Sequence, residues 1–245
     1  MNSGIYTAYS GMQAQADALE IAANNLANIN TVGYKADKAF NSFLRESLSD
    51  SRLSGNLETT VNSSVRSNKA IDFSAGKMTL TGRNLDVAIE GDGFLTVQTP
   101  QGVRYTRNGN MFLNNEGVLV TSNGHPVLGT SGRRIVVEGE GSIYINGSGD
   151  ISLDGMEVDR LKVVVFDDMG TLEKEGNSLF VSKSDPSLKA HAGLQSGFLE
   201  EANINAVSSM VQLVEIMRRF ESIQKSINHE MNDMNSKAID KLGRS

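Results

Sequence analysis

Apolar residues at both ends of this 245-residue chain recur at alternating steps of four and three, the period of a coiled-coil seam. The N-terminal seam consists of Ile5, Tyr9, Met12, Ala16, Leu19, Ala23 and Leu26. The C-terminal seam consists of Leu213, Met217, Phe220, Gln224, Ile227, Met231, Met234 and Ala238. Each seam covers only about three or four heptads, a length at which helix formation alone is marginal in water. The pattern therefore predicts two terminal helices that pair with each other as a coiled coil.

The expected limits of these helices follow from the same pattern. The first helix should run from about Ser3 to Asn28, which at 1.5 Å per residue is roughly 40 Å. Gly33 follows it and is suited to the left-handed conformation that ends helices. The second helix should run from near Ala202 to about Lys241.

Residues 78–201 have the pattern of an antiparallel β-domain. Short runs rich in β-branched and aromatic residues alternate with turn signals, and Asn-Gly between such runs is a strong hairpin signal. The turn signals are Gly91-Asp92-Gly93, Asn108-Gly109, Asn123-Gly124, Asn146-Gly147 and Asp154-Gly155. The runs include Leu85–Ile89, Phe94–Thr99, Val118–Thr121, Ile135–Val137 and Leu161–Phe166. A segment of about 120 residues can bury a hydrophobic core of its own.

The segment before this β-domain, residues 34–77, is polar and has no sustained period, with nine serines between Ser42 and Ser74. We expect an extended connector there, with a short helical piece around Lys38 to Leu48. The predicted fold class is therefore α+β. Residues 1–33 and 202–245 form a terminal coiled-coil domain, residues 34–77 the connector, and residues 78–201 the central antiparallel β-domain.

Composition excludes several classes of protein. The formal net charge is −6, so no nucleic-acid partner is expected. The longest apolar run is Val163–Phe166, too short to insert into a membrane. No basic residue precedes Lys35, so the charged region of a cleaved secretory signal is not expected. The chain has no cysteine, which excludes disulfides, thiol catalysis and cysteine-ligated metals.

The helices carry more apolar residues than a two-helix seam can cover. Ile21, Ile216 and Ile223 lie outside the strict seams, and leaving such residues in water costs about 25 cal/mol per Å² of apolar area. Neighbouring subunits of an assembly could bury them, or they could pack onto the chain's own β-domain. Gln224 interrupts the apolar seam, either to fix its register or as a tolerated polar residue.

Three asparagines, Asn24, Asn25 and Asn28, lie together on the outer face of the first helix, although asparagine is a poor helix former. Each side-chain amide offers donors and an acceptor. These residues could cap the helix end, bond to a neighbouring subunit, or face solvent.

The sequence contains no recognisable catalytic arrangement. His125, His191 and His229 are far apart, without the four-residue spacing of a helical zinc motif, and each is expected to be an ordinary packed or exposed histidine. Asp167 and Asp168 are adjacent, but neighbouring positions in a strand point to opposite faces. We therefore expect no enzyme activity, no cofactor and no metal site. An exported periplasmic enzyme or glycan-binding module remains a much weaker alternative.

Several segments resemble the flagellar rod and hook protein family, in the same order along the chain. Asn24–Lys35 (NNLANINTVGYK) is similar to the N-terminal signature of that family. The segments similar to its central β-domain and closing helix are Leu85–Phe94 (LDVAIEGDGF), Tyr105–Gly109 (YTRNG), Asn203–Val207 (NINAV) and Arg218–Glu221 (RRFE). The length and the opening Ile5–Ala8 (IYTA) are most similar to the proximal-rod subclass, and the distal-rod subclass and hook subunits are the alternatives.

The resemblance implies a structural subunit of the bacterial flagellar basal-body rod. Its terminal helices would pair and assemble with other rod subunits and with further copies of the chain, and the assembly would transmit torque. The resemblance also implies passage through the flagellar type III export apparatus without a cleaved signal peptide, and a location in the periplasm-spanning rod. The expected assembly interface consists of the two seams, without Ala16 and Ala238, together with Asn24, Asn25 and Asn28.

Overall fold

The computed structural model describes residues 2–45, 63–139, 141–188 and 193–242. The chain forms two compact units. Unit 1 consists of Met1–Leu26, Asp37–Ala70 and Asn205–Ser245, and unit 2 consists of Ala27–Ala36 and Ile71–Ile204. The chain therefore passes from one unit to the other at 26/27, 36/37, 70/71 and 204/205.

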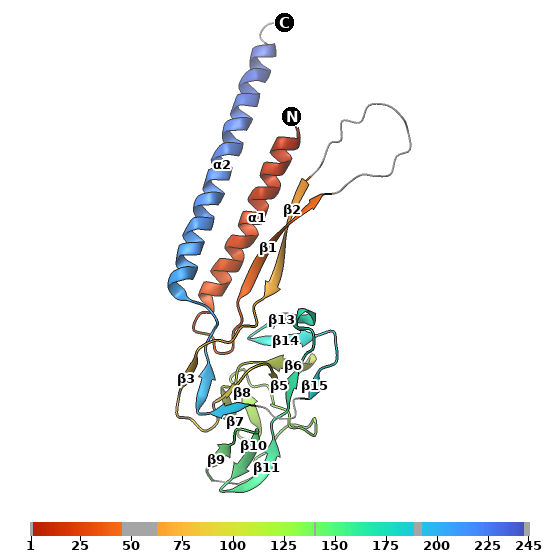
Figure 1. Cartoon of the computed structure of the whole chain (residues 1–245), viewed down its shortest axis with the longest axis vertical. Coiled ribbons are helices and arrows are strands. Elements are labelled where there is room, and N and C mark those ends of the chain that lie inside the picture. Colours follow the sequence, from red (N-terminus) through yellow and green to blue (C-terminus); the bar gives the residue numbers. More distant parts are fainter. Residues whose placement is uncertain (1, 46–62, 140, 189–192, 243–245) are drawn as a thin grey trace, which may run out of the picture. The chain divides into compact units, whose positions relative to one another are not determined.

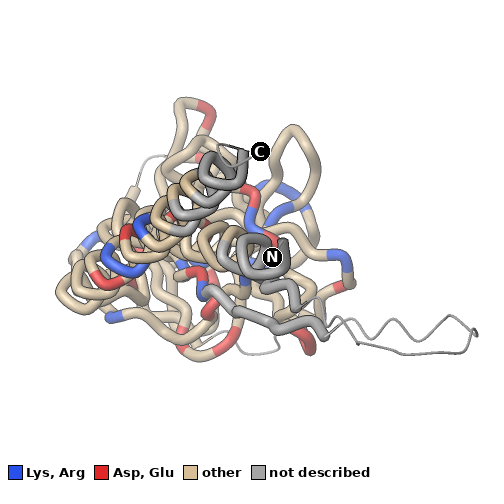
Figure 2. The backbone as a smooth tube through the Cα atoms, turned by 90° about the horizontal axis from the view of Figure 1, so that it is seen from above, with Lys and Arg blue, Asp and Glu red and all other residues tan. Residues whose placement is uncertain are grey.

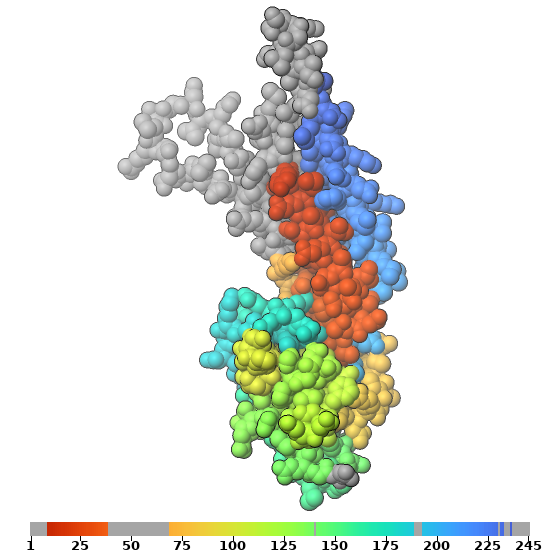
Figure 3. All heavy atoms as spheres, turned by 180° about the vertical axis from the view of Figure 1, so that it is seen from behind, coloured from red at the N-terminus to blue at the C-terminus, as the bar shows by residue number. Residues whose placement is uncertain are grey.

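Unit 1 contains two long helices and a β-hairpin (Figure 1). Its elements are α1 (Asn2–Ala27), β1 (Asp37–Arg45), β2 (Ser63–Ile71) and α2 (Ala206–Leu242), of which the last residues of α1 and β2, Ala27 and Ile71, already belong to unit 2. β1 and β2 form a two-stranded sheet, and α1 and α2 run side by side in Figures 1 and 3. The α+β fold class with a helix at each end is therefore confirmed, while the pairing of the helices as a coiled coil stays a prediction.

The end of α1 and the start of α2 are each determined by neighbouring residues. After α1, the chain turns where Thr31 N donates to Asn28 O at 3.0 Å, and Gly33 then adopts a φ of +67°. A side chain at Gly33 would bring its Cβ within 2.4 Å of Asn108 N, so glycine is required there. α2 begins later than the sequence predicts because Asn205 caps it, its Oδ1 accepting from Ser208 N at 3.1 Å.

The inner face of α2 is a heptad stripe. Among the α2 residues whose side-chain burial is described, the least exposed are Ala206, Ser209, Leu213, Ile216, Phe220, Ile223 and Ile227. This stripe shares Leu213, Phe220 and Ile227 with the predicted seam but contains Ile216 and Ile223 where the seam has Met217 and Gln224. On the part of α1 from residue 9 to residue 27, where side-chain burial is described, the buried residues are Ala14, Ile21 and Ala22. Ile21 and Ile216 are thus buried within the single chain, without a neighbouring subunit.

Unit 2 is an antiparallel β-structure, as the turn signals predicted. The central six-stranded sheet has the order β13-β14-β6-β5-β12-β15, and a three-stranded sheet has the order β11-β10-β9. Two-stranded sheets β16-β4, β17-β3 and β7-β8 complete it. The strands are β3 (Met78–Leu80), β4 (Val87–Ile89), β5 (Phe94–Thr99), β6 (Gly102–Thr106), β7 (Met111–Leu113), β8 (Leu119–Thr121), β9 (Ile143–Ile145), β10 (Asp150–Leu153), β11 (Met156–Arg160), β12 (Val163–Val165), β13 (Leu172–Gly176), β14 (Leu179–Ser182), β15 (Ser187–Leu188), β16 (Leu194–Ser196) and β17 (Phe198–Glu200).

Two apolar clusters form the core of unit 2, one on each face of β5. Leu95 and Val97 belong to a large aliphatic cluster, whereas Phe94 belongs to an aromatic one. Phe94 contacts Phe166 and Phe180 edge to face, with ring centroids 5.7 and 5.6 Å apart. Alternating side chains on one strand thus supply both clusters, which explains why β5 is buried on both faces.

The region predicted to be an extended connector differs from the expectation. The prediction of a short helix around Lys38 to Leu48 is wrong as far as Arg45, because Asp37–Arg45 forms β1 and pairs with β2. Residues 46–48 lie outside the described part of the chain. A short helix is marginal on its own, so pairing with a later strand overrides it. Residues 37–70 belong to unit 1, and the remainder of the predicted connector belongs to unit 2.

Candidate functional site

The outer face of α2 carries an exposed apolar patch over its first three turns. We call it the α2 patch. Its members and their exposed fractions are Val207 72%, Met210 54%, Val211 55%, Val214 46% and Met217 44%. At 100° per residue Val207, Val211 and Val214 point away from the inner stripe, whereas Met210 and Met217 lie at its flank. The helix therefore has apolar residues on two opposite faces, of which unit 1 covers one.

Beyond the α2 patch the same outer face of α2 is polar. It continues with Arg218, Glu221, Lys225 and Asn232, all exposed. Basic and acidic residues are interspersed on this part of the helix (Figure 2). An exposed apolar patch rimmed by polar residues is typical of a protein interaction surface.

The predicted seam residues divide into exposed and partly buried groups. Tyr9, Ala16, Ala23, Met217, Gln224 and Met231 are exposed, whereas Met12, Leu19, Leu26, Leu213, Phe220 and Ile227 are partly buried. The side chains of Ile5, Met234 and Ala238 lie outside the described part. The structure of one chain thus leaves half of each described seam accessible, and the role of these residues in assembly stays a prediction.

The three asparagines have separate surroundings. Asn25 bonds to the backbone of Asp37 twice, through Nδ2 to Asp37 O at 2.8 Å and through Oδ1 from Asp37 N at 2.9 Å. It therefore fastens α1 to the start of β1. Asn28 Oδ1 accepts from Thr31 Oγ1 at 3.3 Å in the turn after α1, and Asn24 is exposed.

A buried charged cluster in unit 2 was not predicted. Lys35 Nζ lies 2.7 Å from Glu200 Oε1 and also donates to Ser74 O at 2.7 Å, while Arg107 Nη1 lies 3.6 Å from Glu200 Oε2. Lys35 and Glu200 are each 1% exposed. No periodicity marks these residues in the sequence, because they come from three distant segments.

Burial governs the ionisation of the two cations in this cluster. Burial lowers the pKa of Lys35 from its ordinary value of 10.5, and the hydrogen bond and charge of Glu200 oppose that shift. Burial also lowers the pKa of Arg107, against the opposing charges of Glu200 and Asp92. Glu200 is the carboxylate that pairs with both buried cations, so it is the member on which the cluster depends.

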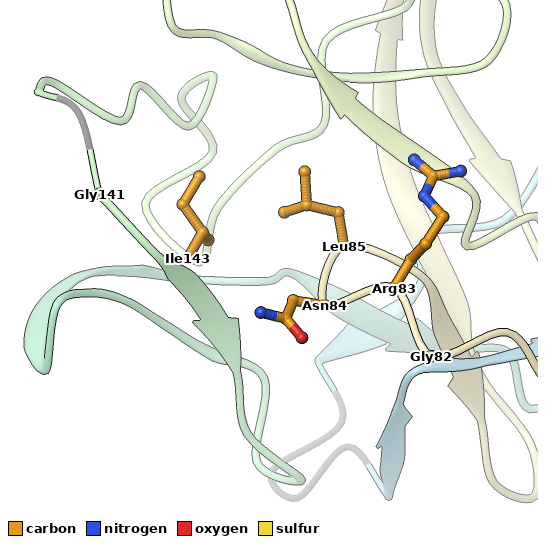
Figure 4. Close-up of a pocket in the computed structure, with 6 residues that line it drawn as sticks. All are labelled: Gly82, Arg83, Asn84, Leu85, Gly141 and Ile143. Carbon is orange, nitrogen blue, oxygen red and sulfur yellow. The ribbon is translucent and has the colours of Figure 1, made fainter.

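Two pockets of unit 2 are lined by described residues, and neither of these linings contains a catalytic arrangement. One, of about 410 Å³, is lined by Gly82, Arg83, Asn84, Leu85, Gly141 and Ile143 (Figure 4). Its charged residue, Arg83, is already engaged, since Nη2 donates to Met111 O at 3.3 Å and the guanidinium lies 4.5 Å from the Phe112 ring centroid. A second pocket, of about 400 Å³, includes His125 and Glu175, and Glu175 pairs with Arg104.

For metal binding and membrane crossing, the structure gives observations only on the described residues. Among the described residues, no group of three or more histidine, cysteine, aspartate or glutamate side chains could hold a metal ion. His229 is exposed, and His191 lies outside the described residues. Neither described helix is long and apolar enough to cross a membrane.

Three family models match consecutive parts of the chain. Residues 5–35 match "Flagella basal body rod protein", residues 88–153 match "Flagellar hook protein FlgE/F/G D1 domain", and residues 195–241 match "Flagellar basal body rod FlgEFG protein C-terminal". The first and third matches include the two seams, and the second extends from β4 to the end of β10.

Curated relatives match over nearly their whole length. The flagellar basal-body rod protein FlgF of Caulobacter vibrioides is 32% identical over 247 residues, covering 100% of this chain and 99% of that protein. FlgF of Rhizobium meliloti is 32% identical over 250 residues, covering 100% of both chains. The basal-body rod protein FlgG of Bacillus subtilis is 30% identical over 249 residues, covering 93% of this chain and 94% of that protein.

Proposed function

The chain belongs to the flagellar basal-body rod protein family and is an FlgF-like structural subunit of the rod, and from this premise we propose that it assembles through its terminal helices and transmits torque. The observation that carries the proposal is the α2 patch. Five apolar side chains between 44% and 72% exposed are costly in a free subunit, at about 25 cal/mol per Å² of apolar area. Burial of the patch against another rod subunit removes this cost.

The proposed contact within each subunit is a coiled coil of α1 and α2. The heptad stripe through Leu213, Ile216, Phe220 and Ile223 supports it, because this spacing keeps one face directed at a partner helix. The exposed seam residues, including Tyr9 and Met217, then remain for contacts with neighbouring subunits. Many such contacts in a helical assembly would resist twisting without any chemical step.

The position along the rod and the route to it belong to the same proposal. The two FlgF relatives span the whole chain, which favours the proximal rod over the distal rod or the hook. We place the subunit in the basal body, delivered by the flagellar type III export apparatus without a cleaved signal peptide. An enzymatic or glycan-binding role has little support, because the charged groups of both pockets are engaged in ion pairs and hydrogen bonds.

A pair of matched substitutions tests the assembly role. Val214 and Asn232 are 18 residues apart, which is five helical turns, so both face outward on the same side of α2. Val214→Glu places a carboxylate in the α2 patch, and Asn232→Glu places one on the polar continuation. We expect Val214→Glu to abolish incorporation into basal bodies and swimming, while Asn232→Glu supports both.

The thermal unfolding transition of unit 2 should be unchanged in both purified variants, because the substitutions lie in unit 1. Normal swimming of the Val214→Glu strain would refute assembly through the α2 patch. Electron microscopy of basal bodies carrying a labelled chain reports whether the subunit lies in the proximal or the distal rod.

A further inference from the structure

Three points at which the chain leaves unit 2 meet in one hydrogen-bonded group, which we call the junction clasp: Ala36, Asp72 and Asn203. Ala36 is the last residue of unit 2 before β1. Asp72 directly follows β2 and is the second residue of the unit 2 segment that begins at Ile71. Asn203 is the next-to-last residue of that segment, before α2. Three of the four passages of the chain between the units therefore begin within two residues of the clasp.

Every pair of clasp residues shares a hydrogen bond. Asn203 Oδ1 accepts from Ala36 N at 2.7 Å, and Asn203 Nδ2 donates to Asp72 O at 2.8 Å. Asp72 N in turn donates to Ala36 O at 2.8 Å. The side-chain amide of Asn203 is the group that joins the other two segments, because it supplies an acceptor and donors from one rigid plane.

The buried charged cluster holds the same three segments in place. Gly33 N donates to Glu200 O at 2.8 Å, and Gly76 N donates to Glu200 Oε1 at 2.8 Å. Lys35 Nζ bridges Glu200 and Ser74. Each of the three segments is therefore also held by a hydrogen bond one to four residues away from its clasp residue.

The next residue along the chain is fixed as well, within unit 1. Asp37 exchanges two hydrogen bonds with the side chain of Asn25. Ala36 and Asp37 are thus each bonded by an asparagine side chain, one in each unit. At the passage 36/37 the backbone N–H and C=O groups of both residues are therefore hydrogen-bonded. This leaves little freedom for the backbone rotations that a hinge requires.

Two units joined by linkers move relative to each other unless something restrains them. Torque that passes through a subunit would be lost in bending of such linkers. We propose that Asn203 is a positioning residue for torque transmission: its amide fixes the directions in which β1, β2 and α2 leave unit 2. This inference rests on the proposed function as a rod subunit.

The experiment measures the spread of distances between the two units in the purified chain. The sequence has no cysteine, so spin labels go only to Gln212→Cys on α2 and Met156→Cys at the β10–β11 hairpin. Pulsed electron paramagnetic resonance then gives the distance distribution. We expect a narrow distribution in the parent chain and a broader one in Asn203→Ala.

A matched variant distinguishes the effect of losing the clasp from the effect of losing hydrogen bonds elsewhere in unit 2. Asn114 Oδ1 accepts from two backbone amides, Glu116 N and Val118 N, each at 2.9 Å, in the turn after β7 and away from every chain passage. We expect Asn114→Ala to keep the narrow distribution. Should Asn203→Ala lose the thermal transition of unit 2, Asn203→Asp replaces it, because it keeps the oxygen that accepts from Ala36 N but loses the donors to Asp72 O.

The same variants are then compared in cells. Asn203→Ala should form rods in normal number, yet its swimming speed should fall more steeply with the viscosity of the medium than that of Asn114→Ala. If the distance distribution of Asn203→Ala is as narrow as that of the parent chain, the positioning role of Asn203 is wrong. A broadened distribution with unchanged swimming at every viscosity would overturn its assignment to torque. Absence of the labelled parent chain from basal bodies would instead reject the proposed function, and the distance measurement would still report on the clasp.

Discussion

The ammonium nitrogen of Lys35 lies 2.7 Å from Oε1 of Glu200, and both side chains are 1% exposed. Lys35 follows α1 by eight residues, and Glu200 precedes α2 by six. Arg107, from the segment after β6, contacts the other carboxylate oxygen at 3.6 Å. The ion pair therefore joins the two ends of unit 2 that continue into the terminal helices.

Removal of Glu200 should cost more than removal of Lys35. Glu200→Leu leaves two buried cations without their carboxylate and Gly76 N without its acceptor, and breaking such a pair costs about 3–5 kcal/mol. Lys35→Met leaves Glu200 with Arg107 and should cost less. Urea unfolding of the two variants measures the difference, and equal losses in the free energy of unfolding would contradict the central role of Glu200.

Asn25→Ala should loosen the junction of α1 and β1. The substitution removes two hydrogen bonds to the backbone of Asp37, each worth about 1 kcal/mol. Hydrogen exchange at the Asp37 amide should accelerate, because that amide loses its acceptor. Gln13→Ala, at an exposed position of the same helix, is the control. Equal exchange rates in both variants would rule out the fastening role of Asn25.

Charges in the predicted seams should block assembly. Leu19→Glu and Ile227→Glu place a carboxylate at central, partly buried positions, and desolvation of an unpaired charge there costs several kcal/mol per subunit. We expect loss of swimming with the thermal transition of unit 2 retained. Ser152→Glu in β10 should be tolerated. If both seam variants swim normally, the coiled-coil model of assembly is wrong.

The pair of Asp150 and Arg160 across β10 and β11 should make unit 2 sensitive to acid. Arg160 and Asn146 hold the pKa of the Asp150 carboxyl below its ordinary value of 3.8. A carboxyl with a lowered pKa stabilises the fold while it is ionised, so its contribution is present above pH 3.8 and is lost as the pH falls through the folded-state pKa.

Unfolding by urea across the acid range tests this. The difference in the free energy of unfolding between the parent chain and Asp150→Asn should be constant at neutral pH and shrink below pH 3.8. Asp168→Asn serves as a comparison, because the carboxyl of Asp168 accepts from Gly170 N at 2.8 Å and caps a short turn. A difference that does not change with pH would show that the ion pair contributes nothing to stability.

Local patterns in the sequence were sufficient for much of the fold. The heptad spacing predicted both terminal helices, and α1 ends within one residue of its predicted limit. Asp154-Gly155 predicted a hairpin, and both residues have positive φ at the turn between β10 and β11. These features depend on residues close in sequence, so they could be predicted without knowing the rest of the structure.

The choice among apolar faces depended on the tertiary structure. Met217 and Ile216 are neighbours and both apolar, so the sequence could not tell which column of α2 faces inward. Burial distinguishes them, with Ile216 7% and Met217 44% exposed. The β1–β2 hairpin was missed for a related reason, since strand pairing joins segments whose local sequences do not identify each other.

Heptad spacing, turn signals and family motifs were sufficient to predict two terminal helices, a central antiparallel β-structure and membership of a flagellar family. The hydrogen bonds that hold the chain where it leaves unit 2 could be identified only in the folded structure. Lys35, Glu200 and Asn203 have no periodicity and stand up to 168 residues apart, as shown by positions 35 and 203. Burial and hydrogen bonding of such distant polar groups arise only when the chain is folded, because each group becomes favourable through the partner that folding brings to it.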